Sequence, residues 1–444
     1  MSPTFRFLMD GPGSSITGSD FLTTATSPRP TGSDCSRSSA AGQGMSALES
    51  AGRRAGELRL PHPDVCVPPN RDKVRFSTYS GRGAVVIALR IWLSSAGAAT
   101  VQVMRLLREN PDGVDVIIYA GNVDPDAPAL SACDVPVVEP RYVGNEEYAQ
   151  FALDFCRVHR IDVLIPPRRL DALAGRVEDF AAIGTHLMCS PAAAVATLTN
   201  KALTYKIASR EGTPVPPWRE VTDADQFEDA VDELSRTGET LCFKPSGEYS
   251  AFGFRILDDR PLTMASLKAA PEPVVSVEAV AAAMRRADME GEAVPPLLVM
   301  PFLDDPEISI DCLSAPGGEL LVGIPRAKQG RFRTMLDDPA LVDIARQLVR
   351  NFELSYLTNV QLRYRSGHPV LLEINPRPSA GLFHTAFAGV NLPWAAVRLL
   401  LKRDAGLRLP PRLPVRIAVA EAVMEVAPAG EGQLIDDLGL REAG

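Results

Sequence analysis

The stretch Asn359 to Asn375, NVQLRYRSGHPVLLEIN, decides the fold of this chain. Two runs of alternating side chains flank Ser366-Gly367-His368, which predicts a β-hairpin with a three-residue loop. In that register Gln361 lies opposite Glu373, and the two-residue period of a strand turns Asn375 to the same face. Three apolar side chains then point to the other face, into a core: Leu362, Leu372 and Ile374.

The three oxygen-bearing side chains suit a metal ion. Carboxylate and carboxamide oxygens are ligands of a hard cation such as Mg2+ (or Mn2+), which keeps several waters and takes other ligands from substrate phosphates. His and Cys are absent from the set, which disfavours zinc. The alternative is that Glu373 and Asn375 form the solvated face of an edge hairpin. Against it, Arg377 follows on a backbone stiffened by two prolines, where it could clamp a transferring phosphoryl group.

The composition restricts the functional class. With 444 residues, 45% of them apolar, the chain can bury two or three domain cores. The net charge of -9 and the lack of a long basic run argue against nucleic acid or an anionic membrane as partner, and favour a small-molecule substrate. No apolar run approaches the ~20 residues of a membrane span. Residues 1 to 9 lack the features of a secretory signal, so we expect a cytoplasmic protein.

The seven cysteines include no CxxC pair, which predicts buried free thiols rather than a disulfide framework or a zinc site.

The chain divides into four parts. Residues 1–73 are rich in Ser, Gly, Thr, Pro and Arg, which predicts a disordered tail. Residues 74–199 alternate predicted strands and helices, starting with a strand at Ala84 to Leu89, which predicts an α/β domain with a parallel sheet. Residues 200–404 predict an α+β region with an antiparallel sheet and a helix at Val277 to Asp288. Residues 405–444 form a C-terminal extension whose role the sequence does not indicate.

The hairpin and its continuation resemble the ATP-grasp superfamily, whose members carry an E-x-N-x-R signature on a strand. Here the signature is Glu373, Asn375 and Arg377, and the upstream ligand Gln361 is most similar to the synthetase halves of carbamoyl phosphate synthase. The resemblance covers roughly residues 84–404. It implies an ATP-grasp fold of two α+β lobes over residues 200–404, preceded by a Rossmann-like pre-ATP-grasp domain.

The resemblance also implies a nucleotide site. Lys201 stands where a family lysine opens a helix, and Lys244 where a second lysine ends a strand before a glycine loop, here Ser246 and Gly247. Both lysines would present point charges to the ATP phosphates. Either lysine taken alone is also compatible with a solvated surface charge. The loop has fewer glycines than the usual family form.

Further along, Met300-Pro301-Phe302-Leu303 resembles the hinge that binds the adenine edge through the carbonyl of Met300 and the N–H of Leu303. Glu307 resembles the family glutamate that holds the ribose hydroxyls. The alternative for Glu307 is an exposed strand residue.

Two groups of arginines are further candidates. Arg326 directly follows a predicted strand at Glu319 to Pro325 and begins a basic cluster with Lys328, Arg331 and Arg333. The cluster could bind the transferring phosphate or a substrate carboxylate, or it could be a solvated basic loop. In the N-terminal sheet, the resemblance makes Ser94 and Ser95 candidate substrate contacts. Arg168 and Arg169 lie at the carboxyl edge where parallel sheets bind ligands, although surface charge is the favoured reading of these two arginines.

The resemblance implies an ATP-dependent ligase that activates a carboxylate as an acyl phosphate and joins it to an amine, with release of ADP and phosphate. Its catalytic residues would be Arg377, Lys244 and Arg326, its cofactors ATP and Mg2+, and its partners a small carboxylate and a small amine. A homodimer is compatible with this. Two alternatives stay open: a carbamoyl-phosphate-synthase-like enzyme acting on bicarbonate, and an inactive nucleotide-binding protein. The sequence identifies neither the acid nor the amine.

Overall fold

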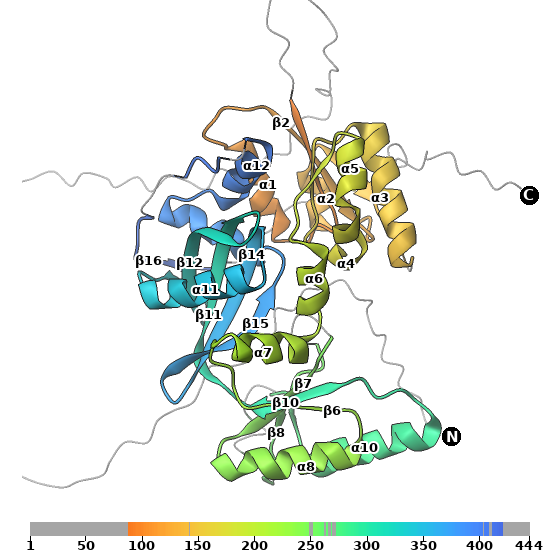
Figure 1. Cartoon of the computed structure of the whole chain (residues 1–444), viewed down its shortest axis with the longest axis vertical. Coiled ribbons are helices and arrows are strands. Elements are labelled where there is room, and N and C mark those ends of the chain that lie inside the picture. The colour runs from red at the N-terminus through yellow and green to blue at the C-terminus, as the bar shows by residue number, and fades with distance from the viewer. Residues whose placement is uncertain are drawn as a thin grey trace, which may run out of the picture. The chain divides into compact units, whose positions relative to one another are not determined.

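The computed structural model describes residues 88–420, apart from 142, 248–251, 262, 265–267, 269–271, 403 and 408–410. These residues form three sheets, which Figure 1 shows with their covering helices. The tail predicted at residues 1–73 lies outside the described residues. So do two of the seven cysteines, whereas the other five are free thiols: Cys133, Cys156, Cys189, Cys242 and Cys312. Among the described residues, no helix is both long enough and apolar enough to cross a bilayer.

The first sheet is entirely parallel, as the alternation of strands and helices predicts. Its strand order is β3-β2-β1-β4-β5. The strands are β1 Leu89–Leu93, β2 Val116–Asn122, β3 Val135–Val138, β4 Val163–Ile165 and β5 His186–Leu187. The helices are α1 Thr100–Arg108, α2 Pro128–Ala132, α3 Asn145–His159, α4 Leu170–Leu173, α5 Val177–Ala182 and α6 Ala192–Leu198.

Alternate residues of β1 divide between two cores, one on each face of this sheet. Ile91 and Leu93 pack with α1, whereas Trp92 packs with α3. The first strand begins at Leu89 rather than at Ala84, and residues 84–87 lie outside the described part. The sequence did not predict α2 and β3, because elements of five and four residues are too short to show a period.

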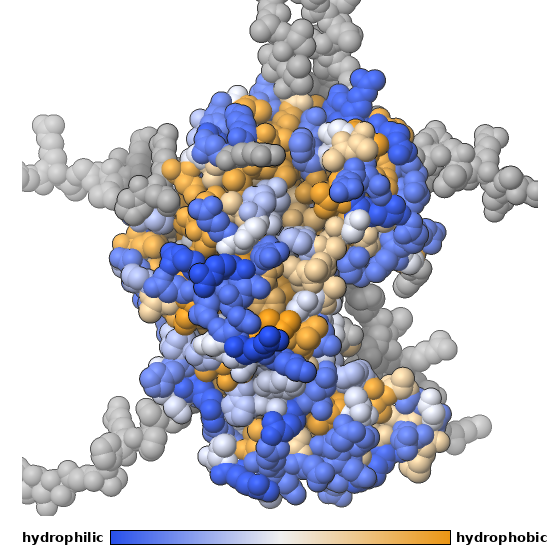
Figure 2. All heavy atoms as spheres, in the orientation of Figure 1, coloured by the Kyte–Doolittle hydropathy of each residue, from blue (hydrophilic) through white to orange (hydrophobic). Residues whose placement is uncertain are grey.

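The second sheet has the order β6-β10-β7-β8-β9 and is covered on one face by two helices. Ser276 caps α10 by accepting a hydrogen bond from the Ala279 amide, and Gly291 ends the helix in a left-handed conformation. Figure 2 shows a mostly hydrophilic outer surface over α8 and α10. The elements are β6 Arg219–Val221, α8 Ala224–Leu234, β7 Leu241–Pro245, β8 Arg255–Leu257, β9 Val274–Val275, α10 Val277–Glu290 and β10 Leu297–Pro301.

The third sheet is antiparallel and has the order β15-β14-β11-β12-β13-β16. Helices α7 and α11 pack on one face, and α12 with the short helix η4 packs on the other. The strands are β11 Asp304–Ala315, β12 Glu319–Gln329, β13 Phe332–Met335, β14 Tyr356–Arg365, β15 His368–Asn375 and β16 Val415–Ala418. The helices are α7 Lys201–Arg210, α11 Pro339–Asn351, η4 Leu382–Ala388 and α12 Leu392–Lys402. Strand β16 comes from the predicted C-terminal extension and pairs with β13.

The hairpin of β14 and β15 pairs Gln361 with Glu373 as predicted, but its loop differs from the predicted one. Arg365 pairs with His368, so the loop has two residues instead of three, and Leu362 pairs with Leu371. The register then shifts between Leu362 and Gln361, and this β-bulge adds Leu372 to the β15 side. The shorter loop and the extra residue cancel, so Gln361 still lies opposite Glu373. Leu371 is the residue that is fully buried opposite Leu362, whereas Leu372 is half-buried and packs against the same core as Leu362 and Ile374.

Two adjacent glycines in the turn between β11 and β12 provide a test of this packing. Both have positive φ, but a Cβ on Gly318 would lie 2.8 Å from the Val349 carbonyl oxygen at the end of α11, whereas a Cβ on Gly317 would meet nothing within 4 Å. Gly318→Ala should therefore lower the free energy of unfolding by ~3 kcal/mol, from backbone strain plus overlap. Gly317→Ala should cost only the strain, ~1 kcal/mol. Urea unfolding of both variants measures the difference, and equal losses would contradict the close approach.

Candidate functional site

Two rows of polar side chains cross the third sheet on one face. In the first row, the register aligns Glu373 with Gln361, Gln361 with Ser309, and Ser309 with Arg326. Since neighbouring strands lie ~4.8 Å apart, this row spans ~14 Å from β15 to β12. The predicted metal ligands occupy one end and Arg326 the other. The second row lies two residues further along and aligns Asn375, Asn359 and Asp311.

The end of these rows that carries the predicted metal ligands has donor groups that suit a hard divalent cation. The Asn375 Nδ2 donates a hydrogen bond to Glu373 Oε1 at 3.0 Å, which leaves the Asn375 Oδ1 as the oxygen for a ligand. In the described part of the chain, the half-buried Gln361 side chain makes no hydrogen bond. One carboxylate and two amide oxygens carry a single negative charge, so a cation here would depend on additional ligands such as phosphate oxygens. Among the described residues, no group of three or more His, Cys, Asp or Glu side chains is arranged so that it could hold a metal ion.

The bulge connects the metal-binding strand to a predicted nucleotide lysine. The carbonyl oxygen of Leu372 accepts hydrogen bonds from Lys244 Nζ at 3.2 Å and from the Tyr205 hydroxyl at 2.8 Å. Lys244 Nζ also lies 5.9 Å from the centre of the Tyr205 ring. Burial lowers the pKa of Lys244, and the charge of Glu373 opposes this shift. Lys244 and Glu373 therefore belong to one electrostatic site, although they come from different sheets.

Sequence reasoning missed Tyr205, which is fully buried on α7. It stands four residues after Lys201, on the same helical face, and this spacing was the available signal. Its hydroxyl is 3.9 Å from the Met300 Sδ, and its ring meets Trp218 edge-on with centroids 6.1 Å apart. Tyr205 therefore contacts the predicted hinge at Met300 and lies beside the predicted nucleotide lysine Lys244.

The other predicted phosphate-binding residues also lie together. Lys201 opens α7, whose first turn is capped by the Asn200 side chain. The Lys201 amide and Nζ both reach the carbonyl oxygen of Ser246, at 3.2 Å and 3.4 Å. Ser246 is buried and donates through its hydroxyl to Glu220 at 2.8 Å. Gly247 is exposed, and residues 248–251 lie outside the described part.

The predicted hinge is the end of β10 and the two residues after it. Met300 and Pro301 pair with β7, and the Phe302 amide donates to the Thr240 carbonyl at 2.7 Å. The N–H of Leu303 donates to no backbone carbonyl within the described residues. Arg363, which the sequence did not indicate, holds the Leu303 carbonyl at 2.9 Å and pairs with Asp305. The Leu303 carbonyl is thus held by Arg363, whereas the Leu303 N–H is available to a ligand. Glu307 lies half-buried in β11, opposite Lys328.

Arg326 lies in a buried network at the other end of the first row. Its guanidinium forms an ion pair with Asp311 at 3.2 Å and donates to Ser379 at 3.1 Å. The Ser379 hydroxyl and Asn359 Nδ2 both donate to Asp311 Oδ1, at 2.6 Å and 3.3 Å, whereas Arg326 contacts Asp311 Oδ2. Because Ser379 belongs to the loop that carries Arg377, the network anchors that loop to the sheet.

The expected strand boundary at Pro325 was wrong. Strand β12 continues to Gln329, so Arg326 and Lys328 lie within it, and Arg326 is 5% exposed rather than part of a solvated loop. Of the remaining cluster members, Arg331 lies in the following turn and Arg333 in β13. Arg377 is half-buried and donates to the Pro378 carbonyl at 3.2 Å.

Sequence reasoning also missed three members of the two rows, Ser309, Asp311 and Asn359, as well as Ser379 in the loop after β15. The signal was present, because polar residues alternate with apolar ones from Glu307 to Asp311 and again from Asn359 to Gln361. What the sequence does not contain is the cross-strand register that brings the two runs together.

His384 lies in η4 on the face of the sheet that also carries Arg326. It is buried, and its Nδ1 has no hydrogen-bond partner in the described part of the chain. Burial, followed by the positive charges of Arg326 and Arg333, lowers the pKa of His384 to about 3. His384 is therefore neutral at neutral pH.

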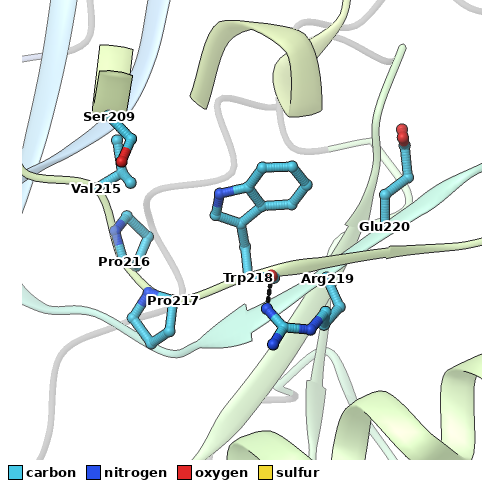
Figure 3. A pocket seen from close by; sticks show the side chains of 7 residues that line it. All are labelled: Ser209, Val215, Pro216, Pro217, Trp218, Arg219 and Glu220. Atoms are coloured by element: carbon cyan, nitrogen blue, oxygen red, sulfur yellow. Dashed lines mark hydrogen bonds between the residues drawn. The ribbon is translucent and has the colours of Figure 1, made fainter. Parts of the chain in front are cut away.

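Two pockets lie away from the polar rows. One is an open hollow of about 720 Å³ along Val215 to Glu220, which Figure 3 shows with Trp218 at its centre and Arg219 donating to the Trp218 carbonyl. Two of its lining residues contact the candidate site: Glu220 through Ser246, and Trp218 through the ring of Tyr205. The other pocket, of about 180 Å³, brings together three of the N-terminal candidates: Ser95, Arg168 and Arg169. Ser94 is fully buried and does not line it.

Comparisons with known proteins agree with this geometry. Residues 293–423, which include both polar rows, match the model of a family described as ATP-grasp in the biosynthetic pathway with Ter operon. The ADP complex of purK, an N5-carboxyaminoimidazole ribonucleotide synthetase, superimposes with a TM-score of 0.53 at 14% identity, over 75% of this chain and 82% of that one.

Two further solved structures share the fold. An L-amino acid ligase from Bacillus licheniformis matches with a TM-score of 0.50 at 16% identity, over 71% of this chain and 74% of its own. A biotin carboxylase from Campylobacter jejuni gives 0.52 at 14% identity, over 72% of each chain. At these identities the likeness shows a common fold. No curated protein matches the sequence.

The buried His384 predicts a pH dependence of stability. Its pKa is about 3 in the folded chain and near 6.5 when unfolded, so between these values the unfolded state binds the extra proton. Stability present above pH 6.5 should thus be lost as the pH falls toward 3, by up to ~1.4 kcal/mol per pH unit from this residue. His384→Phe should flatten the dependence measured by urea unfolding between pH 7 and pH 4, whereas exposed His368→Phe should not. Parallel curves for the wild type and His384→Phe would contradict the lowered pKa.

Proposed function

We propose that the chain is an ATP-grasp ligase that activates a carboxylate as an acyl phosphate and joins it to an amine, forming ADP and phosphate. The observation that carries the proposal is the contact of Lys244 with the strand of Glu373. Through the Leu372 carbonyl, a cation for phosphates stands beside the oxygen donors for a metal, with Arg377 two residues beyond Asn375.

Each part of the site has a task in this proposal. The hinge from Met300 to Leu303 holds the adenine edge, and the Glu307 carboxylate accepts hydrogen bonds from the ribose hydroxyls. Lys201 and Lys244 neutralise phosphate charge. Mg2+, when held by Gln361, Glu373 and Asn375, would supply further positive charge next to the phosphates.

The proposed reaction needs no protein nucleophile. A carboxylate oxygen of the substrate attacks the terminal phosphorus of ATP, and the bond from that phosphorus to the ADP oxygen breaks. The amine nitrogen then attacks the acyl carbon, phosphate leaves with its bonding electrons, and the nitrogen loses a proton. Charge moves onto the transferring phosphoryl group in the first step, where Arg377 would stabilise it.

For Arg326 we propose a supporting role. Its guanidinium is held by Asp311 and Ser379, both from neighbouring elements of the buried network. An arginine in this position would act on the reaction through the loop of Arg377, whose placement depends on Ser379. It would thus be a positioning residue rather than one that touches the phosphoryl group.

The substrates remain open within this class. The solved structures that share the fold are named for different acids and acceptors, and they show only the fold. Bicarbonate is the alternative acid in the reading that resembles carbamoyl phosphate synthase. ADP release that depends on bicarbonate and ammonia, with carbamoyl phosphate as product, would favour that alternative.

Glu373→Gln tests the metal site. The variant keeps the shape and can still accept the hydrogen bond from Asn375, but it removes the only negative charge among the three ligands. We expect circular dichroism to be unchanged and turnover, measured as ADP release, to fall by ~10²-fold or more, with more Mg2+ needed for half-maximal rate. Glu319→Gln, exposed on the same sheet, should behave like the wild type. Full turnover at the normal Mg2+ concentration would remove the metal assignment.

Arg377→Ala tests the phosphoryl-transfer step. In a screen of carboxylic acids with hydroxylamine as the amine, the correct acid should give a hydroxamate together with ADP and phosphate. Arg377→Ala should reduce hydroxamate formation by ~10²-fold while nucleotide affinity, measured by calorimetry, changes little. Exposed Arg350→Ala serves as the matched control. AMP and pyrophosphate as products would exclude the mechanism.

A further inference from the structure

The small cavity of the N-terminal domain lies where parallel sheets bind ligands. In the order β3-β2-β1-β4-β5, the connection after β1 leads to β2 on one side. The connection after β4 leads to β5 on the other side, so the two connections diverge between β1 and β4. The cavity is lined by the ends of these strands: Ser95 follows β1, Asn122 ends β2, Glu139 follows β3, and Arg168 and Arg169 follow β4. Four strand ends thus contribute to one cavity.

The cavity contains a buried carboxylate. Glu139 is 2% exposed and accepts hydrogen bonds from the Ser95 amide at 2.7 Å, the Ser95 hydroxyl at 3.0 Å and the Tyr148 hydroxyl at 3.0 Å. Within the described residues, no cation lies within ion-pair distance of it. Burial raises the pKa of Glu139, and its hydrogen bonds to Ser95 and Tyr148 and the charge of Arg169 oppose this shift; a cation in direct contact would oppose it further.

The chain makes room for this carboxylate. A Cβ on Gly121 would lie 1.9 Å from Glu139 Oε1, so only glycine permits the observed position. Ser95 and Arg169 both adopt left-handed conformations, with φ of 47° and 59°. Non-glycine residues persist in such conformations when the surrounding structure holds them, and they are frequent at binding sites.

Glu139 also determines which ligands are excluded. In nucleotide-binding sheets, the backbone amides after the first strand receive a phosphate. Here the Ser95 amide is already bonded to the Glu139 carboxylate, which occupies the place of an anion and repels one. A phosphate or dinucleotide therefore does not fit next to β1.

Positive charge lies on the wall formed by the residues after β4. Arg169 stacks over the Tyr148 ring at 4.6 Å and donates to the Val143 and Gly144 carbonyls, while its Nε is buried without a partner among the described residues. Arg168 is exposed at the cavity mouth. The cavity therefore offers a carboxylate inside and guanidinium groups toward its rim.

We propose that this cavity binds a small α-amino acid, with the ammonium group paired to Glu139 and the carboxylate facing Arg168 and Arg169. The volume of about 180 Å³ corresponds to about six waters, which suits a molecule with roughly ten non-hydrogen atoms or fewer. An ammonium group would form the ion pair that Glu139 does not make within the described residues, and it can donate three hydrogen bonds. The proposal concerns binding alone and does not depend on the ligase reaction.

Calorimetry on the full chain without ATP or metal tests the proposal. The probes are glycine, L-alanine, L-serine, L-aspartate and the other proteinogenic amino acids of similar size, with ethylamine and L-lactate as analogues that lack one of the two charged groups. At least one amino acid should bind, and the analogues should bind at least tenfold more weakly. No binding across the panel overturns the proposal, as does equal binding of L-lactate or displacement of the amino acid by inorganic phosphate.

Variants then locate the site. Glu139→Gln preserves an acceptor for the Ser95 amide and removes the charge, so amino acid affinity should fall by tenfold or more. Gly121→Ala should have the same effect because its methyl group displaces the carboxylate. Arg168→Gln should lower the affinity for amino acids more than the affinity for ethylamine. The exposed controls Glu178→Gln and Arg160→Gln should bind normally. Normal affinity in folded Glu139→Gln, verified by circular dichroism, places the ligand elsewhere and overturns the proposal.

Discussion

The register of the third sheet is the constraint on which the site depends. A two-residue loop without the bulge would place Gln361 opposite Leu372 and would move Glu373 out of its row. The extra residue corrects this by one position, and its carbonyl then accepts the hydrogen bonds of Lys244 and Tyr205. One local irregularity therefore both aligns the proposed metal ligands and connects them to the sheet that carries Lys244.

The second row shows how the sheet supports a buried charge pair. Taking Asp311 and Arg326 out of water is costly, and such a pair is stable only when the remaining donors and acceptors find partners. Here Ser309, Asn359 and Ser379 provide them. These contacts offset the cost of burying Asp311 and Arg326. Because Ser379 lies in the loop that follows β15, the same contacts also hold the loop of Arg377 in place. Replacing the pair by apolar residues could preserve the sheet but would remove that anchor.

Much of the fold follows from local sequence pattern. Helix α7 begins at Lys201 as expected, and α10 is close to its predicted bounds. The pairing of Gln361 with Glu373 is confirmed, although the three-residue loop on which it was based is wrong. The bulge could not be predicted, since it is stabilised by partners such as Tyr205, 167 residues away in sequence. The same holds for Arg326, whose strand boundary and ion pair depend on neighbours from β11. Its part in catalysis, like the roles of the other site residues, stays a prediction.

Strand β16 has a consequence for any attempt to define the smallest functional unit. It pairs along the whole of β13, from Phe332 to Met335, and it comes from beyond residue 404, where the sequence pattern ends the ATP-grasp region. A chain cut there would leave β13 as a bare edge with unpaired amide and carbonyl groups. Such an edge is a template for strands of other molecules, so the cut protein would be prone to self-association even if every site residue were present. The short terminal strand thus protects the edge of β13 from wrong pairing.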